Sequence, residues 1–193
     1  MSDHHKETFI TKYIFSQDHK MIAKQFLITG MIMAVIGMLM SAMFRVQLAN
    51  PGESSILYNL LPSGWLTETG ALEPDKYLAL VTMHGTILVF WVLTAGLTGT
   101  FANFLIPLQI GARDMASGFL NMLSYWFFFA ATVVLISSIY VQGGPASGGW
   151  TIYPPLSALP QSIPGSGTGM TLWLVSITLF VVGSLLGGLN YIE

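Results

Sequence analysis

Long apolar stretches alternate with short polar segments along the chain, and the charged residues are confined to the polar segments. Charge-free gaps separate Lys24 from Arg45, Lys76 from Arg113 and Asp114 from Glu193. The first gap alone has about the length that a helix needs to cross a ~30 Å hydrocarbon core. The pattern predicts an all-α membrane protein with four transmembrane helices, near residues 22–44, 77–108, 116–141 and 170–192.

Turn-forming residues mark the ends of these predicted helices. Pro107 and Gly111 are expected to end the second helix, and segment 142–169, rich in Gly, Pro and Ser, is predicted to be a loop. Four tryptophans are expected to lie in the aromatic belts at the membrane surfaces. They are Trp65, Trp91, Trp126 and Trp173.

Composition agrees with a membrane protein and excludes several functions. Only 8% of the residues are charged and 53% are hydrophobic, whereas about a quarter of the residues of soluble domains are charged. The net charge is −2 without a basic stripe, so nucleic acid is excluded as a partner. The absence of cysteine excludes disulfides and thiolate metal ligands.

The distribution of positive charge predicts the orientation of the chain in the membrane. Lysines gather in the N-terminal segment, at Lys6, Lys12, Lys20 and Lys24. Because Lys and Arg favour the cytoplasmic side, the N-terminus and the Arg113–Asp114 turn are predicted to be cytoplasmic. Residues 45–76 and 142–169 are then outside. The start lacks the pattern of a cleaved signal peptide, so the first helix is expected to direct insertion.

His84 is the one histidine inside a predicted span. An ionisable side chain at membrane depth suggests a function, and imidazole is a common haem ligand. The alternative is a histidine that bonds to a neighbouring helix or faces a water-filled cavity. Gly85, Gly96 and Gly99 could admit a flat macrocycle or simply let helices pack closely. Since the other histidines precede the first span, a bis-histidine haem would need its second ligand from elsewhere.

Asp114 is the one acid at the predicted inner end of a span, and it also has two interpretations. It could form an interfacial ion pair with Arg113, or it could collect protons at the mouth of a path. Asn103 and Asn121 lie on either side of it in the sequence. Their amides could hold a chain of water or could form helix–helix hydrogen bonds.

Several motifs together resemble subunit I of the haem-copper oxidases, the catalytic subunit of cytochrome c oxidase and its relatives. The longest is "MHGTILVFWVLTAGLTGTFANFLIPLQIGARDMA". The others are "SQDHKMI", "FRVQLANPG", "LNMLSYW" and "GGWTIYPPL", in the order and spacing of the family. The resemblance implies that residues 1–193 are the N-terminal part of a single transmembrane domain of about a dozen helices.

The resemblance implies a role for each candidate residue. His84 corresponds to an axial ligand of the low-spin haem, here expected to be haem A, and Arg45 to a hydrogen-bond partner of that haem's edge. Asp114 corresponds to the entrance of a proton uptake path lined by Asn103 and Asn121. Trp150 and Tyr153 correspond to residues near the propionates of the oxygen-binding haem. That second haem and copper are expected from the remainder of the subunit.

The implied activity is reduction of oxygen to water with electrons from cytochrome c, coupled to proton pumping. Quinol-binding residues of the family would fall on Ile36, Met40, Lys76 and Ala79, which are unsuited to that role. Expected partners are cytochrome c or a cytochrome c domain, other oxidase subunits and the lipid bilayer, in a bacterial inner membrane rather than a mitochondrial one. The alternatives are a quinol oxidase of the same family, a non-catalytic haem-carrying subunit and a transporter-like domain without cofactor.

The chain departs from the family pattern at several positions along the implied proton path. "MASGF" follows Asp114 where "MAFPR" is usual, and Phe26 stands where a tyrosine is frequent. Gln47 replaces a glutamate associated with a structural cation site, so that cation is not expected. These changes leave the entry aspartate intact and alter the water path beyond it.

Overall fold

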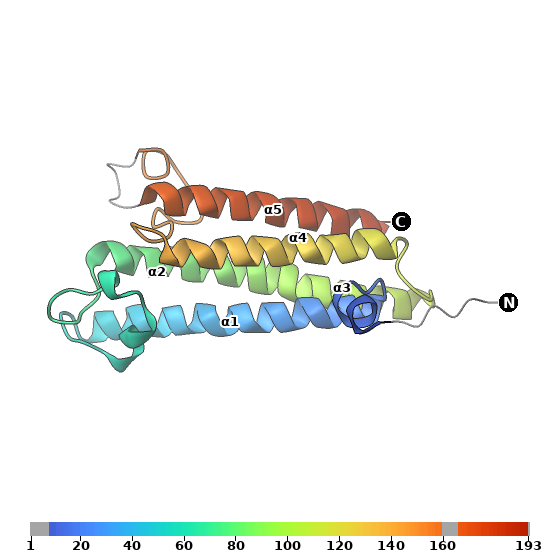
Figure 1. The fold of residues 1–193 in the computed structure, drawn as a ribbon, viewed down its shortest axis with the longest axis horizontal. Coiled ribbons are helices and arrows are strands. Elements are labelled where there is room, and N and C mark those ends of the chain that lie inside the picture. Colours follow the sequence, from blue (N-terminus) through green and yellow to red (C-terminus); the bar gives the residue numbers. More distant parts are fainter. Residues whose placement is uncertain (1–7, 160–165, 193) are drawn as a thin grey trace.

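Four long helices run side by side in the computed structural model (Figure 1), which describes residues 8–159 and 166–192. Four segments are long and apolar enough to cross a membrane: His19–Ala49, Pro74–Ile110, Gly118–Tyr140 and Gly167–Ile192. The predicted all-α fold with four transmembrane helices is therefore confirmed. Lys6, which contributed to the predicted orientation, lies outside the described residues.

The helices begin and end at capping residues rather than at the edges of the apolar stretches. Helix α1 (His19–Ala49) begins after Asp18, whose side chain accepts a hydrogen bond from the Met21 N–H at 3.1 Å. Helix α4 (Gly118–Ser137) begins after Ser117, which caps the Leu120 N–H, and continues into the short helix η5 (Ser138–Tyr140). Helix α5 (Ser166–Ile192) begins inside the segment that was predicted to be loop. Hydropathy alone therefore located the spans but not their ends.

The second span changes its winding in the middle. It consists of α2 (Pro74–Thr86), the π-helical segment η4 (Ile87–Thr98) and α3 (Gly99–Ile110). Within η4 the Thr94 hydroxyl donates to the carbonyl five residues earlier, Val89 O, at 2.8 Å. Pro107 lies inside α3 rather than at its end, and Gly111 ends the helix in the left-handed conformation with φ 71°.

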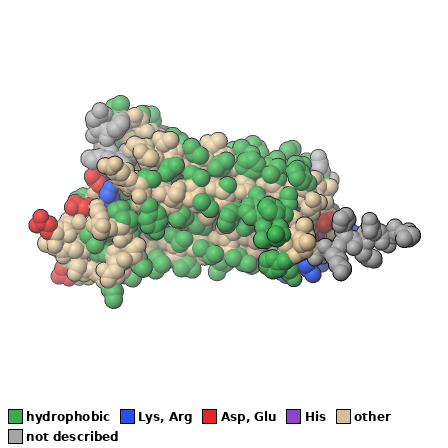
Figure 2. All heavy atoms as spheres, viewed as in Figure 1, with side chains coloured by type: hydrophobic (Ala, Val, Ile, Leu, Met, Phe, Trp, Pro, Cys, Tyr) green, Lys and Arg blue, Asp and Glu red, His purple; other side chains and the backbone are tan. Residues whose placement is uncertain are grey.

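The ends of the bundle differ in charge. Residues 8–18, the last turn of α5 and the turn 111–117 lie at one end, which we call the inner end (Figure 1). The loops 50–73 and 141–159 lie at the opposite, outer end. The first of these loops contains η2 (Ile56–Leu60) and η3 (Ser63–Trp65). Figure 2 shows hydrophobic side chains along the flank of the bundle and acidic ones gathered at the outer end. The relative placement of these segments agrees with the predicted topology.

Small residues bring α1 against the second span. A Cβ built on Gly30 would lie 2.9 Å from the Gly96 Cα, and one built on Gly99 would lie 2.7 Å from the Phe26 ring. Gly96 and Gly99 therefore serve close helix packing, which was one of the two uses considered for them.

The aromatic-belt prediction is wrong for two of the four tryptophans. Trp91 and Trp173 are buried between the spans, and their indole N–H groups donate to Thr132 Oγ1 at 2.9 Å and to Thr86 Oγ1 at 3.2 Å. A buried indole needs a hydrogen-bond acceptor, and here threonines on neighbouring spans supply it.

Candidate haem ligand and proton entrance

His84 is held by the backbone of the neighbouring helix. It lies ten residues after the start of α2, about 15 Å along the helix axis. Its Nδ1 is 2.8 Å from the Gly37 carbonyl oxygen of α1, and its ring packs edge-on against Phe44 with centroids 5.4 Å apart. Because a carbonyl only accepts, Nδ1 carries the hydrogen and Nε2 of the neutral ring keeps its lone pair. This is the arrangement in which a metal-ligating histidine is oriented by its other nitrogen.

The surroundings of His84 leave room for a flat ligand. The side chain is only half-buried, and a Cβ built on the adjacent Gly85 would meet nothing within 4 Å. The residues present therefore fit a haem ligated by Nε2. His19 does not offer a second imidazole nearby: it is the first residue of α1 and lies at the inner end, whereas the sequence analysis put it before the first helix.

The outer loop is tied to the second span beside His84. The Gly149 N–H donates to Thr82 Oγ1 at 3.0 Å, and the Lys76 ammonium donates to the Gly143 carbonyl. Trp150 places its ring 5.6 Å from the ring of Phe90, six residues after His84.

Arg45 and Tyr153 are exposed, Arg45 one residue after Phe44 on α1 and Tyr153 in the outer loop. Neither side chain has a hydrogen-bond partner among the described residues. The structure thus brings Trp150 to the second span and leaves the side chains of Arg45 and Tyr153 free of the bundle.

Asp114 connects the inner turn to the start of α1 and, through His19, to α3. Its Oδ1 accepts the backbone N–H groups of Met115 at 2.8 Å and His19 at 3.3 Å. The His19 ring in turn places Nδ1 2.8 Å from the Asn103 carbonyl oxygen. Within the described part of the chain Asp114 makes no hydrogen bond to Arg113, so the interfacial-pair interpretation finds no support.

Three buried amides lie near the inner end, each on a different span. Asn103 on α3 and Asn121 on α4 have exposed fractions of 0%, and Asn190 on α5 has 2%. The Asn103 Nδ2 donates to the Gly99 carbonyl at 2.7 Å and to the Tyr191 hydroxyl at 3.4 Å, and Asn190 Oδ1 accepts the Ser117 N–H at 2.7 Å. Four amide atoms have no partner among the described protein atoms: Asn103 Oδ1, Asn190 Nδ2 and both polar atoms of Asn121. Buried polar atoms of this kind are normally satisfied by internal water.

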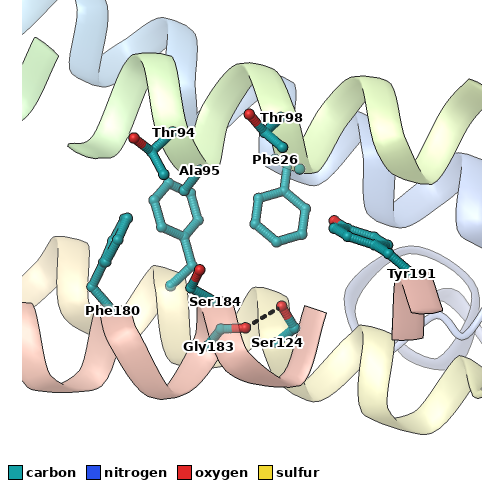
Figure 3. Close-up of a pocket in the computed structure, with 11 residues that line it drawn as sticks. Phe26, Thr94, Ala95, Thr98, Ser124, Phe180, Gly183, Ser184 and Tyr191 are labelled. Atoms are coloured by element: carbon teal, nitrogen blue, oxygen red, sulfur yellow. Dashed lines mark hydrogen bonds between the residues drawn. The ribbon is translucent and has the colours of Figure 1, made fainter. Parts of the chain in front are cut away.

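A cavity adjoins the Asn103 amide through Tyr191, which lines it. It has a volume of about 80 Å³ between α1, the second span, α4 and α5, and it is open at the surface, where Thr94, Thr98 and Ser184 are exposed. Figure 3 shows Phe26, Thr94 and Thr98 on one side and Ser124, Ser184 and Tyr191 on the other. Hydroxyl groups and room for water thus follow the amides inward from Asp114.

Sequence reasoning missed His19, Asn190 and Tyr191. A tyrosine and an asparagine in the last turn of a membrane helix are ordinary interfacial residues. The signal that would have found them is positional, because each of three spans carries an amide near the same end. Depth along each helix had to be compared across spans to see this.

A half-buried imidazole held by a backbone carbonyl, together with buried amides and hydroxyls, marks a multi-span membrane protein with polar groups inside its bundle. Residues 21–193 match the family described as Cytochrome C and Quinol oxidase polypeptide I. The chain belongs to this family, subunit I of the haem-copper oxidases.

Three relatives show the extent of the likeness. The alternative cytochrome c oxidase subunit 1 of Bradyrhizobium diazoefficiens is 41% identical, covering 98% of this chain and 29% of its own length. Cytochrome c oxidase subunit 1 of Thermostichus vulcanus is 38% identical, over 93% of this chain and 28% of its own length. The heme-copper oxidase subunit I+III of Aeropyrum pernix is 34% identical, over 95% of this chain and 20% of its own length. The chain spans less than a third of each of these relatives.

Proposed function

We propose that this chain is the first part of the catalytic subunit of a cytochrome c oxidase, which reduces oxygen to water and pumps protons. The observation that carries the proposal is the His84 imidazole, whose Nδ1 is occupied by Gly37 O and whose Nε2 is left for iron. His84 would hold a low-spin haem A, which supplies one-electron transfer when bound. A second haem and copper belong to the rest of the subunit.

The outer residues would position that haem. Arg45 follows Phe44, which packs on the His84 ring, and its guanidinium would donate a hydrogen bond to a haem held by His84. Trp150 is held over the second span by Phe90 and by the Gly149–Thr82 hydrogen bond. With Tyr153 in the same loop, it would face the propionate groups of the second haem.

The inner residues would take up protons. Asp114 lies at the inner surface, where its Oδ1 accepts the backbone N–H groups of His19 and Met115 and its side chain stays exposed to water. From there Asn103 and Asn121 would line a path of internal water. Asn190, which the sequence analysis did not identify, extends the same set.

A cytochrome c donor is favoured over quinol. Ile36 and Met40 line an apolar pocket at the outer end and offer no polar group for a quinol head. The Lys76 ammonium is engaged by the Gly143 carbonyl, and Ala79 is buried. The proposed partners are therefore cytochrome c or a cytochrome c domain and the other oxidase subunits, in the bacterial inner membrane.

The N-terminus is proposed to face the cytoplasm, because Lys12 in η1 and Lys20 and Lys24 in the first turns of α1 belong to the inner end, whereas acidic side chains gather at the outer end (Figures 1 and 2). The chain has no native cysteine, so single cysteines introduced at Arg113 and Glu53 give unambiguous labels. We expect an impermeant thiol reagent added outside intact cells to label position 53 and not position 113. The reverse pattern would invert the proposed orientation.

The test of function is made on the purified complex containing this chain. We expect two haem signals in the reduced-minus-oxidised spectrum, copper by metal analysis, and oxygen consumption with reduced cytochrome c but not with quinol. One haem without oxygen consumption would indicate a non-catalytic haem-carrying subunit. Absence of haem would indicate a transporter-like domain, and oxygen consumption with quinol would indicate a quinol oxidase.

A further inference from the structure

A groove with a lysine at its rim lies between α1 and α3 on the flank of the bundle. It has a volume of about 250 Å³ and is lined by Ala23, Lys24, Leu27, Thr100, Phe101 and Phe104. The large apolar side chains of this set are exposed, and the Thr100 hydroxyl donates to the Gly96 carbonyl within its own span. Apart from the ammonium of Lys24, the wall of the groove is therefore apolar.

The groove runs from the inner end of the bundle toward its middle. At the start of α1 the His19 ring bonds to the Asn103 carbonyl of α3. Two turns further along α1, a Cβ built on Gly99 would lie 2.7 Å from the Phe26 ring. Because the two helices pass each other in opposite directions, Phe104 lies toward the inner end of the groove. A linear apolar chain in the groove would therefore follow the bundle axis, as the acyl chain of a bilayer lipid does.

Two lysines stand where the groove meets the inner end. Lys24 is in the first turns of α1, and Lys20 lies four residues earlier, on the same face of the helix. Helical side chains lean toward the N-terminus of their helix, which for α1 is the inner end, so the Lys24 ammonium reaches back toward the membrane surface. Both side chains are exposed, and neither forms an ion pair within the described part of the chain. Figure 2 shows basic side chains at this end, beside hydrophobic ones of the flank.

Charge favours a lipid over a protein helix as the occupant of this groove. A helix laid over it would enclose the Lys24 ammonium in an apolar contact, which is costly for an unpaired charge at membrane depth. A phospholipid brings the compensating charge itself, because its phosphate stays at the surface beside the lysines while an acyl chain enters the groove. Basic pockets between transmembrane helices bind anionic head groups in this way.

We propose that the groove between α1 and α3 binds one acyl chain of an anionic phospholipid, whose phosphate is held by Lys24 and Lys20. The lipid belongs to the leaflet at the inner end of the bundle. Since the groove joins α1 to the second span, the bound lipid holds together the two helices that meet at His84 and Gly37. The site requires neither haem nor proton transfer, so its test is independent of the proposed function.

The test uses the purified complex that contains this chain, delipidated and reconstituted into phosphatidylcholine nanodiscs. A trace of phosphatidylglycerol with a photoreactive diazirine on one acyl chain is added, and mass spectrometry locates the lipid adducts after illumination. We expect adducts on the α1 and α3 peptides that line the groove. A diazirine phosphatidylcholine of the same chain length should give about 25-fold fewer adducts there, because each of the two lysines contributes about fivefold.

Two variants separate the charge from the groove. Lys24→Met keeps an apolar stem, and we expect it to lower the phosphatidylglycerol adducts by about fivefold. Lys12→Met is the matched control, since it removes an equal charge at the same end from a residue that lines a different pocket. Leu27→Trp fills the groove and should abolish adducts of both lipids there. Ile28→Trp, at the exposed neighbouring position outside the groove, should leave them unchanged.

Several outcomes would overturn the site. Equal adduct yields from the two lipids, or an unchanged yield in Lys24→Met, would mean ordinary contact with the bilayer. Adducts that persist in Leu27→Trp would place the lipid outside the groove. A groove without adducts, on a flank that is otherwise labelled, would mean that another part of the complex covers it. If Lys24→Met fails to assemble, the comparison of the two lipids on the unmodified complex decides.

Discussion

The outer and inner halves of the bundle differ in how many of their buried polar groups have hydrogen-bond partners in the protein. In the outer half His84 bonds to Gly37, Trp173 bonds to Thr86, and Gln47 Oε1 accepts both the Leu72 N–H at 3.1 Å and the Tyr58 O–H at 3.2 Å. In the described part of the chain, every buried side-chain nitrogen or oxygen atom without a hydrogen-bond partner in the protein lies in the inner half. These atoms belong to Gln25, Asn103, Asn121, Trp126 and Asn190.

The difference agrees with the two roles proposed for these halves. A metal ligand must keep one geometry, and a ring held by a backbone carbonyl and an aromatic neighbour does so. A route for protons needs polar atoms that water can reach and leave, so those atoms cannot all be satisfied by protein.

Removing the imidazole of the outer half should have the largest consequence. We expect His84→Ala to abolish the low-spin haem absorbance, because the described spans carry no other imidazole at the outer end. The measurement is the reduced-minus-oxidised spectrum of the purified complex. His19→Ala is the comparison, since it removes an imidazole at the inner end and should keep the haem. An unchanged spectrum in His84→Ala would exclude it as the ligand.

Removing the carboxylate of the inner half should slow turnover without disturbing haem. Asp114→Asn keeps the shape and the Oδ1 acceptor, and it loses the ability to bind and release a proton. We expect oxygen consumption to fall by roughly 100-fold, the low end of what positioned proton-transfer groups contribute, with native haem spectra. Proton release by reconstituted vesicles should fall in parallel. If Asp114→Asn pumps normally, the inner amides serve only packing.

Deleting a polar group should affect stability in the outer half and not in the inner half. Thr86→Val leaves the Trp173 N–H without its acceptor and should cost about 1 kcal/mol of stability. Asn121→Leu keeps a branched side chain and removes an amide with no protein partner, so the cost should be below about 0.5 kcal/mol. Unfolding midpoints of the complex measure both. A larger loss of stability for Asn121→Leu than for Thr86→Val would contradict this difference between the outer and inner halves.

The smallest effect is expected at Tyr58, in the outer loop. Burial raises the pKa of the Tyr58 phenol above 10.0, so the fold favours the protonated form. The resulting stabilisation is fully present below pH 10 and is lost as the pH rises through the native pKa. The unfolding midpoint of the wild-type complex should fall between about pH 9 and 11 as this stabilisation is lost. We expect Tyr58→Phe to show a smaller fall over the same pH range. Equal drops in both proteins would mean that another group controls the alkaline transition.

The spans were predictable because charge-free length is a one-dimensional property of the sequence. His84 and Asp114 could be singled out for the same reason: each is an isolated ionisable residue at a recognisable depth. The ends of the helices were not predictable from hydropathy, because side-chain caps such as Asp18 and Ser117 set them. These caps act outside the apolar stretches.

What the sequence could not supply was contact between spans. Nothing local shows that the acceptor for His84 is the carbonyl of Gly37, or that Trp91 turns inward to Thr132. The role of Asn190 likewise depends on how α5 lies against the turn at Ser117. Such pairs are fixed by helix packing, and a single sequence carries no record of which helices touch.

The hydrogen bond from His84 to a main-chain carbonyl also determines where mutation can damage the site. No substitution at residue 37 deletes the acceptor, since every amino acid has that carbonyl. The bond depends instead on how closely α1 approaches the second span, and that spacing is set two turns inward, where Gly30 meets Gly96. Harmful substitutions should therefore concentrate at two glycines that never contact the imidazole, and a screen for lost haem should recover them.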